Sequence, residues 1–189
     1  MRRFRVRKGV VPEIRAFSAW RYNKNKIRTL ASVVAPPYDV ISPAEQRSFY
    51  RQNLHNVVRL ILGRTKPGDT SFNNQYTRAG RFFNDWVSSG VLVKDKRPSI
   101  YVYAQDYHVD GKPQSRLGFI ALMRLDEKAV LRHENTLAAP KKDRLALMKE
   151  VRANLSPIFG LFEDWKGKVQ KILKKTPQPP AADVELAVM

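Results

Sequence analysis

The sequence predicts an α+β fold, in which a mixed sheet with an antiparallel hairpin at about residues 100–125 is flanked by helices. Apolar residues recur at three- and four-residue intervals in residues 72–89 and 142–154, which is typical of amphipathic helices. Residues 100–109 instead alternate in character, and Asp110-Gly111 is a two-residue turn signal before a returning strand at 115–125. The two periodicities together indicate helices and antiparallel strands in one protein.

Local signals place two further helices. Ser42 and Glu45 have the spacing of a capping box, and Pro43 occupies the first helical position, so we expect a helix over residues 43–53. Residues 166–175 form a short basic amphipathic pattern, and the proline-rich residues 176–182 cannot continue it. We therefore predict a single α+β domain over residues 1–165, followed by a basic helix and a tail over 166–189.

Two apolar runs, residues 30–35 and 56–62, are predicted to be short buried strands, because both are rich in β-branched residues. Pro36 and Pro37 follow the first run and restrict the chain to extended geometry. This stiff exit is expected to aim Tyr38 and Asp39 at a functional site.

Composition excludes several classes of protein. Apolar residues (43%) and charged residues (28%) occur in the proportions of a soluble globular protein, and no apolar run is long enough to span a membrane. Cysteine is absent, which excludes disulfides, a cysteine nucleophile and thiolate metal sites, and favours the cytoplasm. The three histidines are scattered, so no metal site is predicted.

The net charge of +18 indicates attraction to polyanions, including nucleic acid and nucleotides. Residues 1–30 interleave basic and aromatic side chains, which fits either a nucleic-acid-binding arm or an ordered segment with core aromatics. The row formed by Tyr101, Tyr103 and Tyr107 has the same two interpretations, a stacking surface for bases or one half-buried face of a sheet. No helix-turn-helix, zinc-finger or RNP-type motif supports the nucleic-acid interpretation.

The strongest candidate site combines residues 133–136 (His-Glu-Asn-Thr) with residues 141–144 (Lys-Lys-Asp-Arg). A general base, a proton carrier and phosphate-binding cations would all be present there. The alternative is that these are solvated loop residues before a helix.

Seven stretches, in order, resemble a prokaryotic family known as domain of unknown function 1015. They are Ala-Pro-Pro-Tyr-Asp-Val-Ile (35–41), Asn-Val-Val-Arg-Leu-Ile-Leu-Gly (56–63), Tyr-Val-Tyr-Ala-Gln-Asp-Tyr (101–107), Arg-Leu-Gly-Phe-Ile-Ala-Leu (116–122), His-Glu-Asn-Thr (133–136), Lys-Asp-Arg-Leu (142–145) and Asn-Leu-Ser-Pro-Ile-Phe-Gly-Leu (154–161). Members of that family are about twice as long. Their second half carries an Asp-Gly-His-His-Arg motif like that of the ParB and sulfiredoxin superfamily, which includes free-serine kinases.

The resemblance implies roles for residues of this chain. Glu134, beside His133, would be the general base that activates a hydroxyl, and Lys141, Lys142 and Arg144 would hold phosphates. The residues in supporting roles would be Tyr38, Asp39, Thr136 and Asp143. The implied ligands are a small molecule and a nucleotide, ADP or ATP with Mg²⁺.

One departure qualifies this implication, because Asp-Gly-His-His-Arg does not occur in the 189 residues. The C-terminal domain of the family is therefore expected to be absent. Three functions stay open: a small-molecule phosphotransferase or its N-terminal half, a nucleic-acid-binding module, and a non-catalytic fragment that acts with a partner carrying the missing half.

Overall fold

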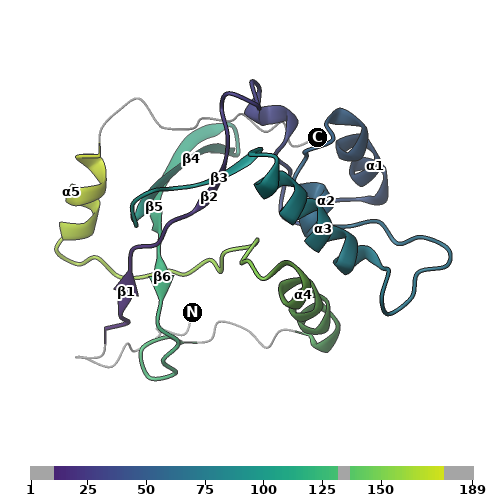
Figure 1. Ribbon diagram of the computed structural model, residues 1–189. Coiled ribbons are helices and arrows are strands. Elements are labelled where there is room, and N and C mark those ends of the chain that lie inside the picture. The colour runs from purple at the N-terminus through teal and green to yellow at the C-terminus, as the bar shows by residue number, and fades with distance from the viewer. Residues whose placement is uncertain (1–10, 132–136, 177–189) are drawn as a thin grey trace. The chain divides into compact units, whose positions relative to one another are not determined.

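A computed structural model describes residues 11–131 and 137–176, which divide into two compact units (Figure 1). The helical unit comprises described residues 20–95 and 137–161, and the hairpin unit comprises described residues 11–19, 96–131 and 162–176. Helices and antiparallel strands both occur, which confirms the α+β class.

The helical unit holds most of the helices. Its elements are, in chain order, β2 (Trp20–Tyr22), the 3₁₀ helix η1 (Leu30–Ser32), α1 (Pro43–Gln52), α2 (Val58–Ile61), α3 (Gln75–Ser88), β3 (Leu92–Lys94) and α4 (Ala138–Val151). Strands β2 and β3 pair antiparallel, with Arg21 opposite Val93.

The start of α1 agrees with its predicted capping box. The Ser42 hydroxyl accepts a hydrogen bond from the Glu45 amide at 3.3 Å, and the Glu45 carboxylate accepts one from the Ser42 amide at 2.7 Å. These bonds favour the ionised carboxylate and lower the pKa of Glu45. The predicted helix at residues 43–53 is therefore confirmed, together with the reason for its start.

Helices α3 and α4 differ from their predicted bounds at both ends: α3, predicted over 72–89, spans Gln75–Ser88, and α4, predicted over 142–154, spans Ala138–Val151. Helix α3 begins at Gln75, because the Asn74 side chain caps it by accepting hydrogen bonds from the amides of Tyr76 and Thr77. Helix α4 begins at Ala138, earlier than predicted, and includes Pro140. A proline in the first turn costs little, because the amides there have no intrahelical acceptor.

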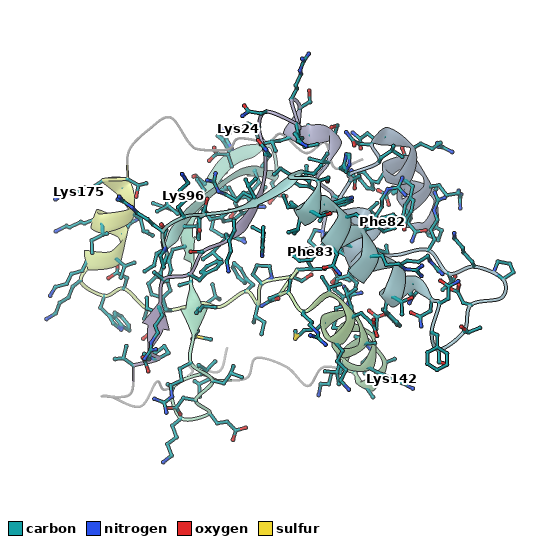
Figure 2. All side chains as sticks on the ribbon, in the orientation of Figure 1. Lys24, Phe82, Phe83, Lys96, Lys142 and Lys175 are labelled. Atoms are coloured by element: carbon teal, nitrogen blue, oxygen red, sulfur yellow. The ribbon has the colours of Figure 1, made fainter. Side chains whose placement is uncertain are left out.

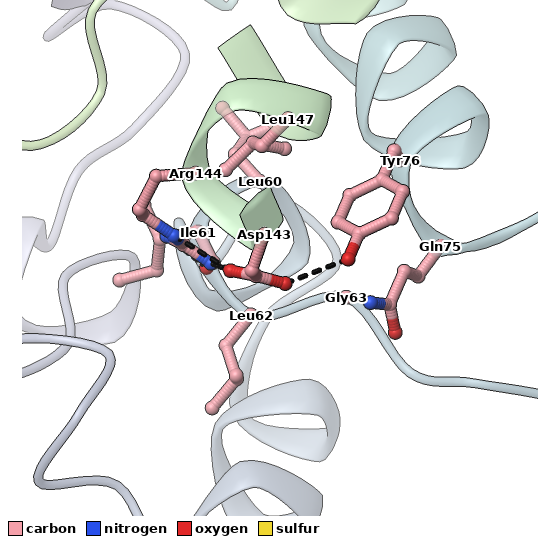
Figure 3. A pocket seen from close by; sticks show the side chains of 9 residues that line it. All are labelled: Leu60, Ile61, Leu62, Gly63, Gln75, Tyr76, Asp143, Arg144 and Leu147. Atoms are coloured by element: carbon pink, nitrogen blue, oxygen red, sulfur yellow. Dashed lines mark hydrogen bonds and ion pairs between the residues drawn. The ribbon is translucent and has the colours of Figure 1, made fainter. Parts of the chain in front are cut away.

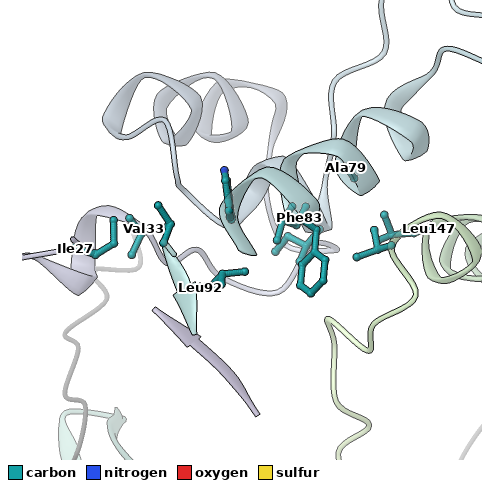
Figure 4. Close-up of a cluster of buried hydrophobic side chains, with 11 residues drawn as sticks. Ile27, Val33, Ala79, Phe83, Leu92 and Leu147 are labelled. Atoms are coloured by element: carbon teal, nitrogen blue, oxygen red, sulfur yellow. The ribbon is translucent and has the colours of Figure 1, made fainter. Parts of the chain in front are cut away.

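One face of α3 forms the centre of the core of the helical unit, as Figure 4 shows for Ala79 and Phe83. Ala79 is fully buried, and Trp86 is 3% exposed. The other buried members of this core are Ile27, Val33, Leu60, Ile61, Phe83, Val91, Leu92, Leu147 and Val151. Of the apolar stripe predicted over residues 72–89, Ala79, Phe83 and Trp86 are buried in this core, whereas Phe72 is 91% exposed and lies before the helix.

Gly80 lies where α3 packs closely against α4. A Cβ atom built on Gly80 would lie 2.9 Å from the main-chain oxygen of Glu150. That separation is shorter than a van der Waals contact, so only glycine allows the two helices to pack this closely.

The predicted strand at residues 56–62 is wrong, because this segment contains the short helix α2. Asn56 lies immediately before it, fully buried, and its side-chain oxygen accepts a hydrogen bond from the Val58 amide at 3.0 Å. The β-propensity of residues 56–62 does not decide their structure here. Val58 and Leu60 are buried in the helical unit and pair with no described strand.

The predicted strand at residues 30–35 is also wrong, and Asn56 supplies the reason. Residues Leu30–Ser32 form η1, and the Asn56 amide nitrogen donates to the main-chain oxygens of Ser32 and Val34, each at 3.0 Å. The Val57 amide donates to the oxygen of Val33 at 2.7 Å. These groups take the acceptors that a neighbouring strand would have used.

The hairpin unit is built around the predicted hairpin. Strands β4 (Tyr101–Val109) and β5 (Lys112–Ile120) pair antiparallel along their whole length, and Asp110 and Gly111 both adopt positive φ, 51° and 73°. Positive φ at both central residues is typical of the type I′ turn that Asp-Gly favours. The hairpin prediction is confirmed.

Other elements of the hairpin unit are small. Strand β1 (Ile14–Arg15) pairs antiparallel with β6 (Leu122–Met123), and α5 (Lys168–Lys174) lies within the predicted basic helix. Across the described residues, the strands form three separate antiparallel pairs in place of the expected mixed sheet. The two runs predicted to be strands, 30–35 and 56–62, contain η1 and α2 and contribute no strand.

The N-terminal aromatics that the structure describes pack against other rings. Phe17 lies 5.1 Å from Tyr101 in the hairpin unit, and in the helical unit Trp20 lies 6.1 Å from Phe83, measured between ring centres. These contacts favour the packing interpretation for Phe17 and Trp20.

Candidate functional site

The predicted catalytic pair, His133 and Glu134, lies outside the described residues, as does Thr136. The remaining predicted site residues belong to the helical unit. Four of them, residues 141–144, lie near the start of α4. Tyr38 and Asp39 lie in the loop before α1.

Asp143 and Arg144 are neighbours in sequence and bind each other in the structure (Figure 3). Arg144 Nε donates to Asp143 Oδ2 at 2.7 Å, and Arg144 Nη2 donates to the same oxygen. Tyr76 on α3 donates its hydroxyl to Asp143 Oδ1 at 2.7 Å, and Arg144 Nη1 donates to the main-chain oxygen of Ile61 at 2.9 Å. This network connects α4 to both α2 and α3.

Tyr38 joins the network through its ring, because the Arg144 guanidinium carbon lies 3.8 Å from the ring centre. This is a cation–π contact. The stiff Pro-Pro-Tyr segment therefore brings Tyr38 to Arg144. Asp39 is exposed and forms no hydrogen bond or ion pair within the described residues.

Lys141 and Lys142 have a different environment from Arg144. Both side chains are exposed, and Figure 2 shows Lys142 at the outer side of α4. Three nitrogens of Arg144 already donate hydrogen bonds within the protein, whereas the two ammonium groups face solvent. Of the three predicted phosphate-binding cations, Arg144 is therefore bonded within the protein, and Lys141 and Lys142 are exposed.

A small cavity of about 30 Å³ lies beside the Asp143 network. Its lining consists of Leu60, Ile61, Leu62, Gly63, Gln75, Tyr76, Asp143, Arg144 and Leu147 (Figure 3). A cavity needs roughly 10–15 Å³ to hold one water, so this one has room for water and not for a nucleotide. The network therefore holds α4 against α2 and α3.

Burial raises the pKa of Tyr76, and its hydrogen bond to the Asp143 carboxylate raises this pKa further. The hydroxyl of Tyr76 consequently stays protonated at neutral pH and keeps donating to Asp143. Asp143 accepts hydrogen bonds at both carboxylate oxygens, and these bonds hold its side chain between Tyr76 and Arg144.

Sequence reasoning missed Tyr76 and the Ile61 carbonyl as members of this network. Tyr76 falls in the apolar stripe of its helix, and its periodicity alone predicts a core residue. A tyrosine at a core position still needs a partner for its hydroxyl. That requirement is the one signal in the sequence that points to a polar group such as Asp143 nearby.

The described residues contain neither a cluster of metal ligands nor a helix suited to cross a membrane. Within residues 11–131 and 137–176, no group of three or more histidine, aspartate or glutamate side chains could hold a metal ion. In the same part of the chain, no helix has both the length and the apolar character that crossing a membrane requires.

Comparison with known proteins gives one match. No curated protein and no solved structure matches this sequence. The sequence model of the family described as "Protein of unknown function (DUF1015)" matches residues 14–187, which is most of the chain. The match spans both units, including α4 and the loop of Tyr38. The chain therefore belongs to the DUF1015 family of proteins of unknown function.

Proposed function

We propose that this protein is a small-molecule phosphotransferase of the serine-kinase type, or one half of such an enzyme. The observation that supports this best is the placement of Lys141 and Lys142. They are exposed on the first turns of α4, a helix fixed by the Asp143 network, and they follow the 133–136 stretch closely in sequence. Cations held on a helix, with a carboxylate close by in the sequence, are components that phosphoryl transfer uses.

In this proposal Glu134 accepts the proton of the substrate's hydroxyl group while the hydroxyl oxygen forms a bond to the γ-phosphorus of ATP. The bond from that phosphorus to the bridging oxygen breaks, and ADP leaves with the bonding electrons. Lys141 and Lys142, with Mg²⁺ on the nucleotide, neutralise the developing charge. Arg144 contributes less directly, because its donors already bind Asp143 and Ile61.

Nucleotide titration tests the binding half of this proposal. With Mg²⁺ and about 0.15 M salt, where exposed charges are screened beyond roughly 8 Å, calorimetry should show stoichiometric binding of ATP or ADP. The variant K141A/K142A should bind at least about tenfold more weakly, since it loses two charge-assisted contacts. Lys149→Ala is the matched control, because Lys149 is exposed on the same helix near its other end.

Glu134→Gln tests the catalytic half. The amide cannot accept the hydroxyl proton, so phosphorylation of an alcohol substrate should be lost while nucleotide affinity stays within about twofold. Equal loss of binding and turnover would contradict the assignment of Glu134 as the base. Absence of nucleotide binding to the wild-type chain would instead favour a non-catalytic protein that acts with a partner.

Nucleic-acid binding is the second candidate function, and α5 is the observation that favours it. Lys166, Lys168, Lys171, Lys174 and Lys175 are all exposed in or beside this short helix. If they bind phosphates of a duplex, affinity should fall roughly several hundredfold between 50 and 200 mM salt, as expected for about five contacts. K171Q/K174Q should reduce that salt dependence, whereas K141Q/K142Q should leave it unchanged. A flat salt dependence would exclude this function.

A further inference from the structure

Two arginines in the helical unit share one aromatic ring. The guanidinium carbons of Arg59 and Arg64 lie 4.3 Å and 4.0 Å from the ring centre of Tyr50. Arg59 also donates to the main-chain oxygen of Tyr50 at 2.7 Å, and the Arg64 amide donates to the Tyr50 hydroxyl at 3.1 Å. The ring thus holds two positive charges close together.

These charges have no acidic partner. Within residues 11–131 and 137–176, no carboxylate forms an ion pair with Arg59, Arg64 or the nearby Arg47. The Nε atoms of Arg59 and Arg64 are buried and lack a hydrogen-bond partner in the same residues. Burial lowers the pKa of Arg59, and the charge of Arg64 lowers it further. Like charges this close are unfavourable unless an anion compensates them.

The carboxylate of Asp69, in the segment between α2 and α3, is already neutralised. Arg78 binds both oxygens of Asp69, at 2.7 and 2.8 Å, and also donates to the main-chain oxygen of Arg64 at 2.6 Å. The hydrogen bonds from Arg78 lower the pKa of Asp69 to about 2. Asp69 consequently compensates Arg78, and the excess positive charge of Arg47, Arg59 and Arg64 remains.

A groove opens beside Arg64. Its volume is about 470 Å³, within the range of about 300–1,000 Å³ usual for sites of small ligands. The lining consists of Gln46, Arg47, Leu62, Gly63, Arg64, Thr65 and Gln75. The lining includes two arginines, two glutamines and a threonine, and none of its side chains is acidic. Gln46 Nε2 donates to the Leu62 main-chain oxygen at 2.9 Å, and Arg64 Nη2 donates to that of Arg47 at 3.5 Å.

We propose that this groove binds the phosphate group of a small phosphomonoester, with Arg47 and Arg64 as the principal contacts. A guanidinium fork matches two oxygens of a phosphate, and stacking on Tyr50 holds the fork of Arg64 in place. Thr65 supplies a hydroxyl at the rim, and the volume beyond one phosphate leaves room for the organic part of the ligand.

This site is independent of the proposed phosphotransfer at Glu134. Its residues lie on α1, in the segment between α2 and α3 and at the first residue of α3, and its test requires no nucleotide. Failure of one proposal therefore leaves the other unaffected.

Calorimetric titration of the whole chain with inorganic phosphate, at constant ionic strength, tests the proposal. We expect saturable binding of one phosphate, and binding of glycerol phosphate at least as tight because the groove accommodates more than the ion. Arg47→Glu should weaken both by at least about tenfold, since it reverses a charge beside the phosphate. Arg51→Glu is the matched control, because it makes the same charge change one turn further along α1, outside the groove lining, and should cost less than about threefold.

Arg64→Lys separates the contribution of the planar guanidinium fork to binding from that of the positive charge. It keeps the positive charge but loses the planar pair of donors and should weaken binding by about tenfold, with circular dichroism confirming that the variant is folded. Equal weakening by Arg47→Glu and Arg51→Glu would show diffuse attraction to a basic surface and overturn the proposal. So would the absence of saturable binding of both phosphate compounds by the wild-type chain.

Discussion

Replacing Asn56 with alanine should lower the free energy of unfolding of the helical unit by about 3–5 kcal/mol. The side chain is fully buried and makes three hydrogen bonds of 3.0 Å, to the oxygens of Ser32 and Val34 and from the amide of Val58. The alanine variant leaves three main-chain groups without these partners, and each buried group that loses its partner costs about 1–3 kcal/mol. Urea unfolding followed by tryptophan fluorescence measures the loss, because Trp86 is buried in the same core.

Two further variants sharpen this prediction. Asn84→Ala is the control, since Asn84 is exposed on α3, and it should change stability by less than about 0.5 kcal/mol. Asn56→Asp keeps the acceptor for Val58 but loses both donors and buries a carboxylate, so it should be at least as destabilising as alanine. An Asn56→Ala variant as stable as the control would contradict the role given to this residue.

Replacing Gly80 with valine should destabilise the helical unit by about 3 kcal/mol. The new Cβ would lie 2.9 Å from the Glu150 main-chain oxygen, and a main-chain atom cannot turn aside as a flexible side chain does. Helices α3 and α4 must then separate, which opens the contact around Leu147. Urea unfolding measures this loss of stability. The unfolding temperature of the variant should fall as well.

The alanine variant at the same position gives a graded test. Alanine gains up to about 1 kcal/mol in helix propensity over glycine, which offsets part of the steric cost, so the net loss should be about 1 kcal/mol. Gly118→Ala is the comparison, because a Cβ there meets no atom within 4 Å. A Gly80→Ala variant more stable than wild type would show that the two helices can separate freely.

Elements with local signals were predictable from the sequence. The Ser42 cap, the Asp110-Gly111 turn and the apolar stripe of α3 each specify structure within a few residues of themselves, and each prediction is confirmed. The runs at 30–35 and 56–62 were mistaken for strands because their conformation depends on each other. Asn56 connects them through hydrogen bonds between residues more than 20 positions apart, which no local pattern reveals.

The candidate site, too, could be predicted only in part from the sequence. Asp143, Arg144 and Tyr38 were selected together from the sequence, and the structure places them in contact. Arg144 donates hydrogen bonds to Asp143 and to Ile61, a main-chain acceptor that sequence does not mark, and its predicted phosphate-binding role stays a prediction. Glu134, His133 and Thr136 lie outside the described residues, so their predicted roles stay predictions.

The two-stranded form of the β4–β5 sheet has a consequence for association. With only two strands in this sheet among the described residues, each nine-residue strand has one outer edge whose main-chain groups face no neighbouring strand. Such edges invite pairing with strands of other molecules. Pro113 brings no amide hydrogen to its strand, and Lys112 and Asp106 place exposed charges along the hairpin. These residues make the hairpin a poor template for a third strand. Its long, exposed edges therefore do not promote aggregation.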